Sequence, residues 1–252
     1  MKKVLFLFTL FPLLLSAQIN ESDSLNFKVD LSLSGFWQTG NVETVIFRAN
    51  SNISYRPFDK FVFKSSNSYV YQEFGNAKAD EDILSLNFLY LNPERRLYPQ
   101  LIGFLSTNFR REIDLRYLIG AGLTYQVLKK EKDWLKFSIS SEYEHTDFAR
   151  DRFNTVEYNG TPSINTMRGT FWANGKYHLF NNKVIVTHES YFQPSLSRSD
   201  NFRWRADINL QFPIAKYLNF KVNYLHFYES VVIEGQVRED QFLTFGFVLK
   251  SY

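Results

Sequence analysis

A histidine and a serine two positions apart are the residues of this sequence best suited to nucleophilic catalysis. His188 and Ser190 would share one face of an extended strand, and Asn201 follows at the start of the next strand. A serine nucleophile needs a base within hydrogen-bonding distance and a third group that orients the base, and these residues could supply those roles. The alternative is that both are ordinary strand residues. We favour that alternative, because geometry identifies a site and spacing alone does not.

A second set of residues could select solutes by charge. The set consists of Arg48, Arg110, Glu142, Glu144, Arg203, Arg205 and Asp207. In each strand they occupy the alternating positions that carry polar residues, which we call the polar phase. In a closed barrel these side chains would line the lumen. Opposed charges in a pore create a transverse field that favours small charged or zwitterionic solutes. Alternatively, the arginines and carboxylates pair and fill the interior, and we favour this filled lumen for a barrel of this size.

Neither a metal site nor a cofactor is expected. The other histidines, His145, His178 and His226, lie on separate strands without a second ligand at usable spacing. The acidic residues 80–82 are expected to form a solvated loop and not a calcium site. The sequence contains no cysteine, which excludes disulfides, thiolate metal sites and cysteine nucleophiles.

The element that would position these residues is clearest at residues 201–212. Six apolar residues alternate there with polar ones, from Phe202 and Trp204 to Phe212. A strand places every apolar side chain of such a run on one face, whereas a helix would scatter them. The run also has the length of roughly 9–11 residues that a tilted strand needs to cross a bilayer.

Repeats of this element predict about twelve strands. We expect them at residues 25–38, 44–56, 61–74, 84–90, 101–110, 116–128, 135–144, 166–179, 184–192, 201–212, 220–228 and from 243 to the end. Gly120 and Gly122 fall on the inner face, where they leave room for a bulky neighbour or permit curvature. The sequence therefore predicts an all-β fold: a closed, antiparallel, transmembrane up-and-down β-barrel of about twelve strands.

The lengths of the connections predict an orientation. Those after the second, sixth, eighth and tenth strands are short, whereas those after the third (residues 75–81), seventh, ninth and eleventh are longer. Short turns face the periplasm in bacterial outer-membrane barrels, which would place both termini there. The longest connection, residues 147–165, could bind a partner at the cell surface.

Composition and charge agree with a membrane barrel. Aromatic residues make up 18% of the chain, which suits the aromatic girdles of such barrels, and mean hydropathy is −0.28, too low for a bundle of apolar helices. The formal charge is +3, and without Lys2 and Lys3 it would be +1. So small a charge provides no field that would attract nucleic acid.

The amino terminus has the layout of a secretory signal peptide. A basic start at Lys2 and Lys3 precedes an apolar stretch over residues 4–15 and the small residues Ser16 and Ala17. We expect cleavage after Ala17, which gives a signal peptide over residues 1–17 and one barrel domain over residues 18–252. The apolar stretch is well short of the ~20 residues that a spanning helix requires.

Three segments resemble a known family. They are residues 33–44 (LSGFWQTGNVET), 116–125 (RYLIGAGLTY) and 134–145 (WLKFSISSEYEH). They are similar to the YdiY-like family, a domain of unknown function whose members include salt-induced outer-membrane proteins. The resemblance implies an outer-membrane location and no specific activity.

Two further resemblances concern smaller features. His188, Ser190 and Asn201 resemble the arrangement in outer-membrane phospholipase A, although Tyr191 and Phe192 stand where that family has an Asn-Gly pair. The carboxyl end resembles the signal read by the outer-membrane insertion machinery, with a terminal Tyr252 that falls in the polar phase.

Three functions remain open on the sequence alone. The first, which we favour, is a non-enzymatic structural or envelope-stress barrel in contact with outer-membrane lipid. The second is a narrow channel for small charged or zwitterionic solutes. The third, more remote, is a phospholipase-like hydrolase.

Overall fold

The structure is a computed structural model that describes residues 26–40, 43–130 and 132–249. The expected signal peptide and the terminal Tyr252 lie outside the described residues. The strands are β1 (Phe27–Gln38), β2 (Thr44–Phe58), β3 (Phe61–Phe74), β4 (Ala77–Leu91), β5 (Leu97–Asn108), β6 (Ile113–Lys129), β7 (Trp134–Phe148), β8 (Ser163–Leu179), β9 (Val184–Pro194), β10 (Phe202–Ala215), β11 (Leu218–Glu229) and β12 (Glu239–Leu249).

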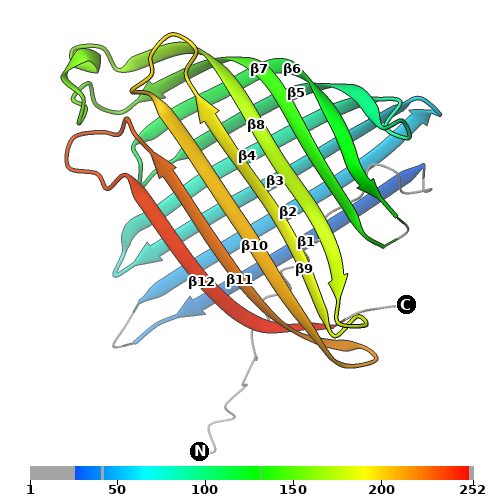
Figure 1. The fold of residues 1–252 in the computed structure, drawn as a ribbon. Helices are drawn as coiled ribbons and strands as arrows, with labels where there is room; N and C mark the ends of the chain where they lie inside the picture. Colours follow the sequence, from blue (N-terminus) through cyan, green and yellow to red (C-terminus); the bar gives the residue numbers. More distant parts are fainter. Residues whose placement is uncertain (1–25, 41–42, 131, 250–252) are drawn as a thin grey trace, which may run out of the picture.

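All twelve strands form a single antiparallel sheet in sequence order, each paired with its neighbour along the chain. This confirms the predicted all-β, up-and-down architecture. The sheet curls strongly, and its strands run at a marked tilt to one another across the two sides of the molecule (Figure 1). Among the described residues, β1 and β12 are the two edges of the hydrogen-bonded order. The ladder that would close a barrel is therefore not part of the described pairing.

The two faces of the sheet have opposite polarity. Large apolar side chains cover the convex face, where Leu31 is 73% and Trp37 is 77% exposed. The concave face carries polar residues, and Glu142 and Glu144 on β7 are each only 1% exposed there. In a water-soluble protein this order is reversed, because ionised groups are almost never fully buried unless they are paired.

Strand β4 departs from this rule. Its apolar residues Leu86 and Phe88 pair in register with Ser66 and Lys64 of β3, which places them on the concave face. The ring of Phe88 contacts Trp172 of β8 from across the interior, with a centroid distance of 6.2 Å. The expectation that every apolar row faces outward is therefore wrong for this strand, since β4 helps to fill the interior.

The connection after β3 is also shorter than predicted. Residues 75–81 were expected to be a loop, but β4 begins at Ala77 and only Gly75 and Asn76 form the turn. Both have positive φ, at 57° and 61°, as a two-residue type I′ hairpin requires. The acidic residues 80–82 lie within this strand, where Asp80 is paired with Arg110 at 3.2 Å.

Three longer connections interlock at one end of the sheet. They are residues 149–162, which include the short 3-10 helix η1 (Val156–Tyr158), residues 195–201 and residues 230–238. Asn154 joins the first to the third, because its side-chain amide donates to the carbonyl of Ser230 at 2.9 Å and its Oδ1 accepts from the Val232 amide at 3.0 Å. We call these three segments the loop cap.

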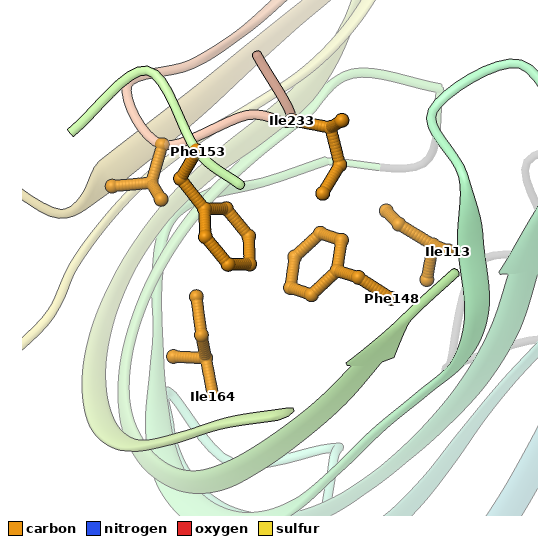
Figure 2. Close-up of a cluster of buried hydrophobic side chains, with 6 residues drawn as sticks. Ile113, Phe148, Phe153, Ile164 and Ile233 are labelled. Carbon is orange, nitrogen blue, oxygen red and sulfur yellow. The ribbon is translucent and has the colours of Figure 1, made fainter. Parts of the chain in front are cut away.

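A hydrophobic cluster lies beneath the loop cap and blocks this end of the interior. Its side chains point toward one another from β6, β7, β8 and the cap itself (Figure 2). The members are Ile113, Phe148, Phe153, Ile164, Val231 and Ile233. The rings of Phe148 and Phe153 meet edge to face at 5.0 Å, a favoured aromatic geometry.

No helix among the described residues has the length and apolar character needed to cross a membrane.

The loop cap should loosen in acid. Arg150 donates to the Glu112 carboxylate, and this bond, together with one from Gln236, holds the pKa of Glu112 below its usual range. A group with a depressed pKa contributes stability above its unfolded pKa, about 4.3, and the contribution disappears as pH falls through the folded value. We therefore expect hydrogen exchange in residues 149–162 to accelerate below about pH 4.3.

Glu112→Gln is the matched control, because the amide keeps an acceptor for Arg150 and does not titrate. Its cap should exchange at a rate that varies little over this pH range once the intrinsic rate is subtracted. Equal acid sensitivity in both proteins would contradict the role of Glu112.

Candidate functional site

Paired charges occupy the concave face below the loop cap. Glu144 on β7 accepts from Arg168 of β8 at 2.9 Å and also from Arg203 of β10. Gln193 of β9 accepts from the Nε of Arg203, and Asn201 accepts from Arg168 at 2.9 Å. The carboxylate of Glu144 is therefore shared between two guanidinium groups on two different strands.

A second ion pair crosses the interior. Arg116 on β6 donates both terminal nitrogens to Glu229 on β11, at 2.8 and 3.0 Å, and its Nε donates to Thr146 at 3.1 Å. These two strands are five positions apart in the sheet order, so they meet only because the sheet curls back on itself. A two-pronged arginine–carboxylate bond is among the strongest polar contacts in proteins and fixes orientation as well.

Glu142 completes this group with neutral partners. Its carboxylate accepts from the hydroxyls of Ser140 and Thr170, the latter at 2.7 Å. A glycine of β6 makes room for it: a Cβ on Gly120 would lie 2.7 Å from the Glu142 Cγ. Gly120 therefore leaves room for the bulky Glu142 side chain, as predicted. At Gly122 a Cβ would instead meet the Ile139 carbonyl and the small Ser140, so this glycine allows a close approach of β7. We call Arg116, Glu142, Glu144, Arg168, Arg203 and Glu229 the interior charge cluster.

The other predicted lumen residues lie elsewhere. Arg205 and Asp207 are on the concave face of β10, joined at 3.0 Å. Arg48 is on the concave face of β2 and is exposed. Arg110 follows the end of β5 in the turn to β6 and binds Asp80 of β4, so its predicted place on a strand is wrong.

Sequence analysis missed Arg116, Arg168 and Glu229 as members of the cluster. Their phase could have revealed them, since Arg168 lies directly opposite Glu142 in the register of β7 and β8. Arg116 likewise shares the even-numbered face of β6 with Gly120 and Gly122. The partner of Arg116 could not have been found in this way, because it lies across the interior and not on a neighbouring strand.

The three residues considered for catalysis are not brought together. His188 and Ser190 are on the convex face, where the His188 Nε2 lies 3.2 Å from the Tyr177 hydroxyl. Asn201 instead bonds Arg168 on the concave side and Tyr158 in the cap. The register partner of Ser190 on β10 is Ala206, and five residues along a strand span about 17 Å. This separation leaves the imidazole without the orienting amide.

The remaining histidines have separate carboxylate partners. His145 lies 2.9 Å from Asp147, and His178 lies 2.8 Å from Asp133. In the parts of the chain that the structure describes, no three histidine or acidic side chains gather where a metal ion could be held.

A cavity lies beside the interior charge cluster on the concave face. Its volume is about 460 Å³, and its lining residues come from each of the strands β1 to β10. Arg205 and Asp207 line it, whereas the six residues of the interior charge cluster do not. The interior therefore has a blocked end and a hollow part.

Replacing the central carboxylate should destabilise the protein strongly. Glu144→Gln would leave Arg168 and Arg203 buried without their shared counter-charge, a defect that typically costs about 3–5 kcal/mol. Urea unfolding of the detergent-folded protein measures this change. The matched control is Glu239→Gln on β12, whose side chain is 56% exposed. Equal effects of the two substitutions would contradict the central role of Glu144.

Comparison with known proteins places the chain in a family. The model of DUF481, described as a protein of unknown function, matches residues 29–250. A solved structure titled "NanC porin structure in rhombohedral crystal form" is similar with a TM-score of 0.48 and 10% identity, over 88% of this chain and 100% of that one. No curated protein matches significantly. The YdiY-like resemblance concerns this same family and is confirmed. The chain therefore belongs to the DUF481 family of proteins of unknown function.

Proposed function

We propose that this protein is an integral outer-membrane β-barrel whose interior is blocked at the capped end, with a structural, non-enzymatic role in the envelope. The observation that carries the proposal is the reversed polarity of the sheet. Apolar side chains such as Phe27, Leu33 and Phe245 are exposed on the convex face, while arginines and glutamates are buried on the concave face. Lipid tails, and not water, solvate an apolar surface of this extent at low free energy.

Strand length supports a membrane-crossing role. The strands contain 11–17 residues, and a tilted strand crosses a bilayer with roughly 9–11. The additional residues extend past the apolar core on both sides. The loop cap follows from this geometry as the part that stands outside the bilayer.

Closure between β1 and β12 is part of the proposal. An open sheet edge would leave backbone amides and carbonyls without partners in lipid, and each costs several kcal/mol. An even number of strands in a meander makes the first and last antiparallel, which is the pairing that closes bacterial barrels. Both chain ends then lie at the end opposite the loop cap, which we assign to the periplasm.

The blocked end of the interior favours a structural role over transport. The hydrophobic cluster and the interior charge cluster together block the capped end, and each charged group there has a counter-charge or a hydrogen bond. A buried polar network in which every group has a partner makes a structure rigid. This network therefore stabilises the state in which the capped end of the interior is blocked. Partner binding through residues 147–165 remains part of the proposal as an additional role of the cap.

One observation favours a second candidate function, a narrow channel for small charged or zwitterionic solutes. The cavity is lined by both a cation and an anion, Arg205 and Asp207, which are suited to such solutes. This channel would require the loop cap to move away from the capped end.

Single-channel recordings in planar bilayers distinguish the two functions. The wild-type protein should give no conductance steps, because the loop cap and the two clusters fill one end. A variant lacking residues 151–159 is the control, since removing part of the cap should produce steps and prove that the barrel has inserted. Wild-type steps that change with Arg205→Ala would instead establish the channel.

Disulfide cross-linking tests the closure between β1 and β12. The sequence contains no cysteine, so only the introduced cysteines can form a disulfide. We expect Leu31→Cys on β1 to cross-link with a cysteine at Leu243, Phe245 or Phe247 on β12 in isolated membranes. A cross-linked protein should also keep the fast electrophoretic migration of a folded barrel. Failure of all three pairs, or a mature chain that folds in water without detergent, would contradict the proposal.

A further inference from the structure

The cavity on the concave face has the size of a small-molecule site. Its volume of about 460 Å³ lies within the range of roughly 300–1,000 Å³ that such sites occupy. It is separate from the interior charge cluster, so the charges that stabilise the fold do not occupy it. The chemistry of its walls therefore indicates what it could hold.

One wall is aromatic. Phe88 and Trp172 meet edge to face at 6.2 Å, and Tyr90 stacks against Phe88 at 5.5 Å. All three residues line the cavity. The face of an aromatic ring carries partial negative charge, so it attracts the weakly positive C–H groups on one side of a sugar ring.

A second part of the lining consists of small neutral polar groups on β1, β2 and β3. They are Ser32, Asn50, Asn52, Ser66 and Ser68. Amides and hydroxyls each offer both donors and acceptors, which is what a ligand with several hydroxyls requires. The hydroxyl of Ser66 already donates to Asn52 at 2.8 Å, so this wall is ordered in part by its own bonds.

The charges at the cavity are mixed and largely paired. Arg205 binds Asp207 at 3.0 Å, and the other Asp207 oxygen accepts from Asn209 at 3.1 Å. Asp30, Glu189 and Lys64 complete the ionisable lining. With both signs represented at the same cavity, no strong field favours an ion, and a neutral ligand fits this environment better than a charged one.

Five polar atoms on lining residues have no hydrogen-bond partner within the described part of the chain. Two are donors, Trp172 Nε1 and Arg205 Nε, and three are acceptors, Asp30 Oδ2, Asn174 Oδ1 and Asn209 Oδ1. An unpaired buried polar atom is costly, so five of them around one cavity are unusual. A hydroxyl group satisfies both kinds, because it accepts from a donor and donates to an acceptor.

We propose that the cavity binds a neutral, polyhydroxylated ligand of mono- or disaccharide size. One face of the ligand lies against Trp172 and Phe88, and its hydroxyls bond the asparagines and serines of β1, β2 and β3. This assignment goes beyond the structural role proposed above, because it gives the interior a ligand and does not require an open pore.

Calorimetric titration of the detergent-folded protein with maltose, sucrose and lactose tests the assignment. We expect saturable one-to-one binding of at least one of these sugars. Trp172→Leu removes the aromatic wall and Asn209→Ala removes an acceptor, and each should weaken binding about tenfold. Asn87→Ala is the matched control, since Asn87 is on the convex face of β4 outside the lining, and it should leave the affinity unchanged.

A comparison of glucose with glucose 6-phosphate tests whether the site prefers a neutral ligand. Weaker binding of the phosphate supports the proposal, and tighter binding would overturn it. Failure of glucose and of all three disaccharides to bind a correctly folded barrel would overturn it as well. Electrophoretic mobility before and after heating reports the fold independently, so that loss of the ligand assignment is distinguishable from loss of the barrel itself.

Discussion

The structure depends on the pairing of opposite charges in the buried part of its interior. Three guanidinium groups and three carboxylates make up the interior charge cluster, and Glu142, Glu144 and Arg168 are each at most 4% exposed. Isolated ions cannot remain charged at such positions, because burial removes hydration worth many kcal/mol. The strands that carry them must therefore keep their relative positions closely. A small shift of β7 against β10 would separate Glu144 from Arg203.

The same constraint explains the order of the layers. The interior is polar where the charge cluster, the asparagines and the serines lie. Apolar side chains face it at the hydrophobic cluster, along β4, and at Ile102, Leu118 and Trp172. Leu86 and Phe88 on the inside of β4 line the cavity together with polar side chains of β1 to β3. The convex face of β4 is apolar at Ile83, Leu89 and Leu91 and polar in between, where Ser85 donates to Asn67 of β3 at 2.6 Å.

Most of the fold could be predicted because its alternation is local. In β10 every second residue from Phe202 to Phe212 is apolar, and the strand bounds differ from the prediction by few residues. The prediction failed where polar and apolar residues do not alternate regularly along a strand, or where the apolar residues face inward. On β3, Ser65 and Asn67 share the phase of Tyr69, and on β4 the apolar phase faces inward, so the pattern alone could not identify the inner side. The hairpin at Gly75 was missed because the charged start of β4 resembles a solvated loop.

The candidate site was predicted less completely, for a geometric reason. Phase identifies which side chains share a face, and on that basis Glu142, Glu144 and Arg203 were correctly grouped as polar-phase residues of their strands. Pairing across the interior depends on how far the sheet curls, which no local pattern encodes. Two contacts are of this kind. They are the bond of Arg116 to Glu229 and the bond of Asn201 to Arg168.

The bond between Arg116 and Glu229 also has a consequence for how the chain reaches its final state. The two residues are separated by 113 positions in the sequence, and the closing of so long a segment is slow. Until the last hairpin has arrived, Arg116 has no anionic partner on β11, and the half-built interior stays hydrated. Burial of Arg116 is therefore a late event in the maturation of this protein, because it requires β11 to be in place.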